Sequence, residues 1–181
     1  MLLLPARFVI LETALLMSIV VFSDLNVLTL GSKGSTVRQL QRGLNLRFHQ
    51  LGAAVAAFVL VDGVFGPHTL TSVKYLQCIG GLPVDGRVGD RSWALITQGA
   101  VGLPVLLIGS TGTEVLAVQQ VVADAGIPSP QNSQFDQATA RAVIAYQRQR
   151  GLPITGIVGP RTWDRVVRSR LHSLPCTVLL P

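Results

Sequence analysis

The sequence predicts an all-α fold: two tandem, small three-helix domains whose helices are joined by glycine-rich turns. One half of the chain repeats in the other, apolar residues recur at helical spacing, and glycines fall where one helix must end and the next begin. Of 181 residues, 49% are hydrophobic and 13% are charged. This composition is enough for a core and carries too little charge for a disordered protein.

The repeat is clearest where residues 81–93 align without a gap on residues 151–163. Both segments start with Gly-Leu-Pro and end with Trp, at an offset of 70 residues. Residues 30–37 align on residues 108–115 at an offset of 78. The first repeat therefore carries eight additional residues, which we place in the Ala- and Val-rich run 48–60.

These alignments divide the chain into two homologous domains joined by residues 99–104. Each domain is small but long enough for a core of its own. The expected organisation is an apolar N-terminal segment, two domains and an apolar tail: residues 1–26, 27–99, 105–172 and 173–181.

The first two helices of each domain follow from periodicity and end signals. Val37, Leu40 and Leu44 share one face of the first helix. The second helices are predicted over residues 67–79 and 137–150, ended by glycine at 80 and 151. The third helix of each domain then follows the next glycine-rich turn.

A shorter motif, Val-Asp-Gly-x-apolar-Gly-x-x-[Thr/Ser], precedes the second and third helices. Residues 61–69, 84–92 and 154–162 keep its form, whereas residues 132–139 have lost both glycines. Glycine accepts the positive φ of a tight turn, and Asp bonds its own backbone there. Because Ser133 cannot supply positive φ without strain, we expect the degraded turn to take a different shape.

Three composite patterns carry a family resemblance. L-x-x-G-x-x-G-x-x-V-x-x-L-Q, D-G-x-F-G-x-x-T-x-x-x-V-x-x-x-Q and G-L-x-V-D-G-x-V-G-x-x-[TS]-W together resemble the three-helix peptidoglycan-binding domain. The resemblance covers residues 27–99 and 105–168 and implies binding of the glycan strand or stem peptide of peptidoglycan. It departs from the family at the eight-residue insertion and at Asp136, which stands where the first repeat has Gly66.

Exposed charged side chains on or beside the turns are the candidate ligand-binding residues. Carboxylates there can accept from amide or ammonium donors of a stem peptide, and arginines can pair with its carboxylates. The candidates are Asp62, His68, Asp85, Arg87, Arg91 and Arg161.

Two matched pairs have structural explanations instead. Trp93 and Trp163 lie at helical spacing from apolar residues, so we expect core positions rather than sugar stacking. Gln77 and Gln147 are expected to be half-buried and bonded to loop carbonyls.

The sequence signals no catalysis, metal site or cofactor. None of His49, His68 and His172 has a partner at zinc-ligand or nucleophile spacing. Cys78 and Cys176 form no CxxC motif. Their spacing leaves a disulfide open, but we expect two separate buried thiols.

The net charge of +6 favours anionic partners. Only 6% of residues are aromatic, which argues against a base-stacking surface and hence against nucleic acid. Residues 1–22 predict either a signal peptide, hence a periplasmic or wall-associated protein, or an apolar helix packed on the first domain.

The function expected is non-catalytic binding of peptidoglycan by two tandem modules, with the first, which keeps both Asp-Gly turns, carrying most of the affinity. The alternative is a cytoplasmic or membrane-associated interaction protein of the same fold, or an accessory subunit that partners a separate wall hydrolase.

Overall fold

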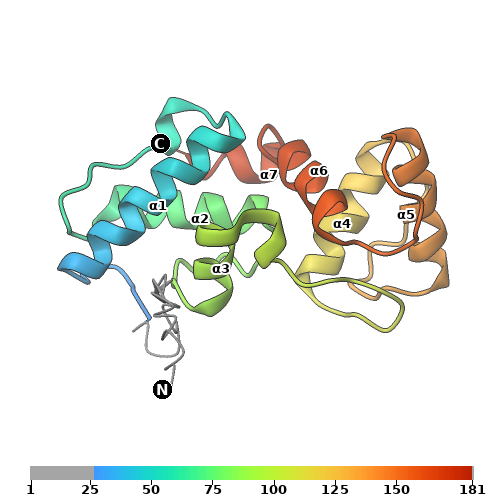
Figure 1. The fold of residues 1–181 in the computed structure, drawn as a ribbon, viewed down its shortest axis with the longest axis horizontal. Coiled ribbons are helices and arrows are strands. Elements are labelled where there is room, and N and C mark those ends of the chain that lie inside the picture. The colour runs from blue at the N-terminus through green and yellow to red at the C-terminus, as the bar shows by residue number, and fades with distance from the viewer. Residues whose placement is uncertain (1–26, 181) are drawn as a thin grey trace, which may run out of the picture.

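The structure is a computed structural model of the chain in which residues 27–180 are described, and within this range it is helical, with isolated β-bridges but no longer strand (Figure 1). The predicted segment 1–26 lies outside the described residues. The first repeat contains α1 (Ser35–Leu51), the short 3₁₀ turn η2 (Val55–Ala57), α2 (Pro67–Ile79) and α3 (Asp90–Gln98). After the 3₁₀ turn η3 (Gly99–Gly102), the second repeat contains α4 (Thr113–Asp124), α5 (Gln137–Gln149) and α6 (Pro160–Arg170), and a short α7 (Leu174–Thr177) follows.

The all-α prediction and the helix pattern are confirmed. The apolar face of α1 is buried, as its spacing predicts, and α2 has the predicted bounds. At the end of α2, Gly80 keeps helical φ, and the turn is made by Gly81 at φ 71°. Its counterpart after α5 is Gly151, at φ 66°. Glycine is needed at both positions because other residues rarely adopt this conformation.

The segment before the first helix of each repeat ties the two turns of that repeat together. Leu28 pairs with Val88, and Leu106 pairs equivalently with Val158. A second bridge joins this segment to the first turn of its repeat, at Lys33–Val64 and Thr111–Gln134. Equivalent bridges therefore hold the first and second turns in equivalent positions in both repeats.

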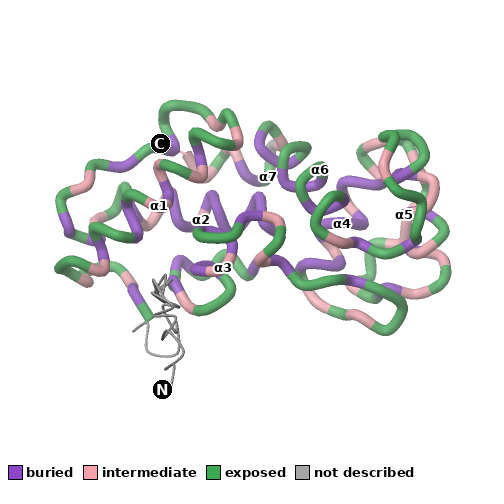
Figure 2. Tube along the Cα trace, viewed as in Figure 1, coloured by how far each residue is buried: buried purple, intermediate pink, exposed green. Residues whose placement is uncertain are grey.

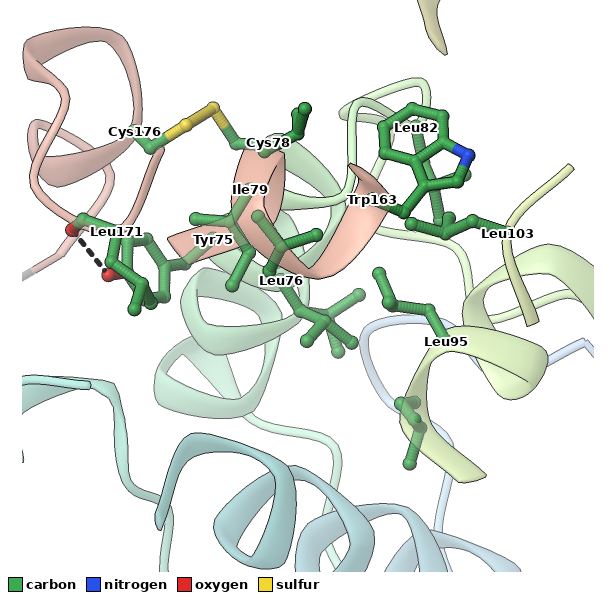
Figure 3. Close-up of a cluster of buried hydrophobic side chains, with 14 of the residues drawn as sticks. Tyr75, Leu76, Cys78, Ile79, Leu82, Leu95, Leu103, Trp163, Leu171 and Cys176 are labelled. Carbon is green, nitrogen blue, oxygen red and sulfur yellow. Dashed lines mark hydrogen bonds between the residues drawn. A yellow bond between two sulfur atoms is a disulfide. The ribbon is translucent and has the colours of Figure 1, made fainter. Parts of the chain in front are cut away.

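The two repeats share one hydrophobic core, as the buried stretches of α2, α4 and α6 indicate (Figure 2). Trp163 lies among Leu82, Leu95 and Leu103 of the preceding chain (Figure 3), and its Nε1 donates to the carbonyl of Pro104 at 2.6 Å. Gly81 allows the close approach, since a Cβ there would lie 2.6 Å from that of Ala117.

The chain end folds back onto the first repeat, where Cys176 of α7 forms a disulfide with Cys78 of α2 (Figure 3). The expectation of two separate thiols is therefore wrong. The cysteines are 98 positions apart in sequence, but packing of α7 on α2 brings their Cα atoms to 5.5 Å, a usual disulfide separation. Beside them, the Tyr75 hydroxyl donates to the carbonyl of Leu171 at 2.8 Å.

The predicted tail is largely packed, because Cys176 is fully buried and Leu179 and Leu180 lie against the core. No helix within residues 27–180 is both long enough and apolar enough to cross a membrane.

Candidate functional site

Each glycine-rich turn is organised by a buried glutamine. In the first turn, Gln41 Oε1 accepts from the Gly63 amide at 2.8 Å, while its Nε2 donates to Asp62 Oδ1 at 2.7 Å. In the second turn, Gln77 makes the same contacts with Gly86 and Asp85, both at 2.9 Å. The prediction that Gln77 bonds a loop carbonyl is confirmed, because its Nε2 also donates to the carbonyl of Arg87 at 2.9 Å, although the side chain is fully rather than half buried.

One oxygen of each turn carboxylate takes part in these hydrogen bonds. Asp62 Oδ1 also accepts from the Val64 amide at 2.8 Å. The Val64 N–H, followed by the Gln41 side chain, holds the pKa of Asp62 below its usual value. The Asp85 Oδ1 likewise accepts from the Arg87 amide at 2.9 Å. Both residues thus shape the turns, and each keeps a second carboxylate oxygen for other partners.

The degraded turn of the second repeat keeps the shape of its counterpart, so the expectation of a different loop is wrong. Ser133 adopts φ 61° and donates its amide to Gln119 Oε1 at 3.0 Å. Asn132 replaces the turn aspartate, accepting from Gln119 Nε2 at 3.0 Å. The same hydrogen-bonded framework holds the turn, at a cost for positive φ on the order of 1 kcal/mol.

A surface hollow lies at the second turn of each repeat. The first hollow has a volume of about 310 Å³ and the second about 470 Å³. Their linings correspond position by position across the 70-residue offset. They share the pairs Pro83 and Pro153, Asp85 and Thr155, Arg87 and Ile157, Gly89 and Gly159, Asp90 and Pro160, Arg91 and Arg161, and Ser92 and Thr162.

Gly89 and Gly159 are the N-cap residues of α3 and α6, and neither the backbone nor the packing requires glycine there. Their φ values are −97° and −99°, which any residue adopts, and an added Cβ would have no atom within 4 Å. No side chain caps either helix. By contrast, Asp136 caps α5 by accepting from the Thr139 amide at 2.7 Å. The two glycines therefore leave the first backbone N–H groups of both helices without a side-chain cap, beginning at Asp90 in α3 and, because Pro160 has no N–H, at Arg161 in α6. Both residues line the hollows.

The two hollows differ in chemistry. Charged side chains line the first hollow: Asp85, Arg87, Asp90 and Arg91. In the second hollow, Thr155, Ile157 and Pro160 replace the first three, and Arg161 is the charged residue that remains. The first hollow suits carboxylate, amide and ammonium groups, and the second suits a more apolar surface with an acceptor at its edge.

The structure gathers four of the six predicted site residues in these hollows. Asp85, Arg87 and Arg91 line the first hollow and Arg161 lines the second, whereas Asp62 and His68 lie at the first turn of repeat 1, outside both hollows. A ligand-binding role for each of these six residues stays a prediction.

Arg91 has a further partner in the second repeat. Its Nη1 lies 2.6 Å from Glu114 Oε1; the Arg91 side chain is 70% exposed and that of Glu114 6%. Arg91 therefore forms an ion pair between the two repeats and also lines the first hollow.

The glycines of the hollows were missed from sequence. Gly89 and Gly159 align across the repeats, but glycine is also a common helix N-cap. The alignment alone therefore does not indicate that these glycines line surface hollows. The core assignment of Trp93 and Trp163 is confirmed, because both are buried. Residues 27–180 contain no cluster of His, Cys, Asp and Glu suited to a metal ion.

Comparison with known families identifies the class of protein. A profile described as "Putative peptidoglycan binding domain" matches residues 33–96 and 111–166, one match in each repeat and more than half of the chain. The chain belongs to this family and contains two tandem copies of its domain.

A crystal structure of a peptidoglycan-binding protein from Clostridioides difficile, in complex with glutamine hydroxamate, is 36% identical over the aligned part. The alignment covers 37% of this chain and 42% of that one, with a TM-score of 0.36. The chain thus spans less than half of that protein. Comparison with curated protein sequences gave no match.

Proposed function

We propose that this protein is a non-catalytic peptidoglycan-binding protein that engages the polymer through the two second-turn hollows. The observation that carries the proposal is the pair of equivalent hollows, each with an uncapped helix N-terminus and a glycine that the fold itself does not require. Family membership supplies the ligand class.

Peptidoglycan offers groups that match both hollows. Carboxylates and carbonyls of the stem peptide accept from the open N–H groups of α3 and from Arg87. The remaining oxygen of Asp85 accepts from peptide amines. The apolar faces of sugar rings suit Pro153 and Ile157 in the second hollow.

The disulfide supports export of the protein to the periplasm or cell wall. Disulfides persist in oxidising compartments and are rare in the cytosol. Cys176 is fully buried and its bond to Cys78 connects two packed helices, as is typical of a structural disulfide.

The direct test is cosedimentation of the full chain with insoluble purified peptidoglycan, using cellulose as a matched insoluble control. We expect saturable retention on peptidoglycan that soluble wall fragments reverse. Equal retention on both polymers would contradict the proposal. A zymogram tests the non-catalytic part, and a cleared band from the purified protein would contradict it.

A further inference from the structure

A third cavity lies outside the two hollows, where the C-terminal ends of α4, α5 and α6 meet the start of α7. Its volume is about 660 Å³, within the usual range for small-molecule sites. The residues that matter for its chemistry are Gln120, Asp124, Arg150, Arg170 and Ser173. We call it the junction cavity.

Arg170 is a buried cation in this cavity with only uncharged hydrogen-bond partners. It is 8% exposed, and its Nε donates to the carbonyl of Cys78 at 3.0 Å. Its Nη1 donates to Gln120 Oε1 at 3.1 Å, and its Nη2 has a weak contact of 3.8 Å with Cys78 Sγ. Among the described residues, no carboxylate lies within 4.0 Å of this guanidinium. A buried charge normally has a close partner of opposite charge, and no described residue supplies one to Arg170.

The electrostatics agree with this geometry. Burial lowers the pKa of Arg170, and the negative charge of Asp124 opposes that shift without contacting the guanidinium. A second guanidinium lines the same cavity: Arg150 Cζ lies 5.5 Å from the ring centroid of Tyr146, whose face favours a cation at that position. Two guanidinium groups and one carboxylate give the cavity a net positive charge.

We propose that the junction cavity binds the carboxylate of an amino acid or short peptide, with Arg170 and Arg150 as its partners and Asp124 as acceptor for the amine of the same ligand. A guanidinium presents its N–H donors in a planar fork that matches a carboxylate. Asp124 disfavours a dianion such as phosphate but complements a ligand that carries both a carboxylate and an ammonium group. The site uses neither hollow, so it stands independently of the proposed wall binding.

The test is a titration of the ¹⁵N-labelled, oxidised full chain with alanine and with alanyl-alanine, followed by NMR. We expect saturable shifts of the Gln120, Asp124 and Ser173 amides. Alanyl-alaninamide, which lacks the carboxylate, should bind about tenfold more weakly or worse, because it forfeits the charge-assisted hydrogen bonds. Tighter binding of alanyl-alanine would identify a peptide ligand, and tighter binding of alanine a free amino acid; either supports the site.

Three variants make the test specific. Arg150→Glu should weaken alanyl-alanine binding about tenfold, because it reverses a charge that contacts the carboxylate. Arg170→Gln should remove binding. Because Arg170 also bonds the last turn of α2, this variant can fail to fold, and in that case the Arg150→Glu result decides the test. Arg165→Glu, an exposed arginine of α6 outside the cavity, is the matched control and should bind like wild type. Equal affinity for acid and amide, or equal effects of Arg150→Glu and Arg165→Glu, would overturn the proposal.

Discussion

Cys78, in the last turn of α2, is bonded to Cys176 of α7, so the end of the chain is covalently tied to the first repeat. The bond closes a loop of 98 positions that contains α3 and the entire second repeat. Together with the shared core, it makes the tandem one structural unit. Separating the repeats into two fragments would expose this core.

Removing the disulfide should destabilise the protein strongly. In Cys78→Ser/Cys176→Ser, we expect the free energy of unfolding to fall by about 4 kcal/mol, because the long loop is no longer closed in the unfolded chain. Urea denaturation measures this, and reductant should destabilise the wild type but leave the variant unchanged. A loss below about 1 kcal/mol would contradict a structural role for the bond.

Comparing alanine substitutions at Gly81 and its counterpart Gly151 distinguishes the cost of inter-repeat packing from that of backbone strain. Both have positive φ, but a Cβ at Gly81 would meet Ala117, whereas a Cβ at Gly151 has no atom within 4 Å. Gly151→Ala should cost about 1 kcal/mol of strain, and Gly81→Ala about 1–3 kcal/mol more from overpacking. Equal losses in thermal or urea unfolding would argue against the close contact of the repeats.

The pKa of Asp62 predicts a pH dependence of stability. Its folded pKa lies below the unfolded value, so the unfolded state binds more protons as the solution becomes acidic. Its contribution is therefore present above the unfolded pKa and is lost as the pH falls through the folded pKa. Asp62→Asn keeps the acceptor oxygen, as Asn132 does in the second repeat. Between about pH 6 and about pH 3, values on either side of the unfolded Asp pKa, this variant should lose less stability than the wild type. Parallel pH profiles from urea unfolding would contradict this role.

The helices could be predicted because they depend on local signals, and the tandem repeat because the sequence aligns on itself. Apolar spacing places the α1 face, and proline with glycine brackets α2. The same spacing places Trp93 and Trp163 in the core. The helices and their buried faces need only neighbours in sequence.

The rest depends on contacts between distant segments. Nothing local indicates that α7 packs on α2, so the disulfide was missed. Ser133 adopts positive φ because Gln119 and Asn132 hold the turn, and this outweighs its local preference. The hollows form where the third-helix N-termini face the preceding turns, which the repeat alignment cannot show.

The charged first hollow should contribute more to wall binding than the second. Gly89→Trp fills the first hollow and Gly159→Trp the second, without a φ penalty at either position. Because charge-assisted hydrogen bonds are roughly twice as strong as neutral ones, we expect Gly89→Trp to weaken cosedimentation with peptidoglycan more. An equal or larger loss in Gly159→Trp would shift the main contact to the second repeat.

The most direct measurement is peptidoglycan affinity of the double variant Gly89→Trp/Gly159→Trp beside the control Gly66→Trp. Gly66 is the N-cap of α2, has φ −87° and equally open space, but lies outside both hollows. With folding confirmed by circular dichroism, we expect the double variant to bind at least about tenfold more weakly, while Gly66→Trp binds like wild type. Wild-type affinity in the double variant, or an equal loss in Gly66→Trp, would contradict binding through the hollows.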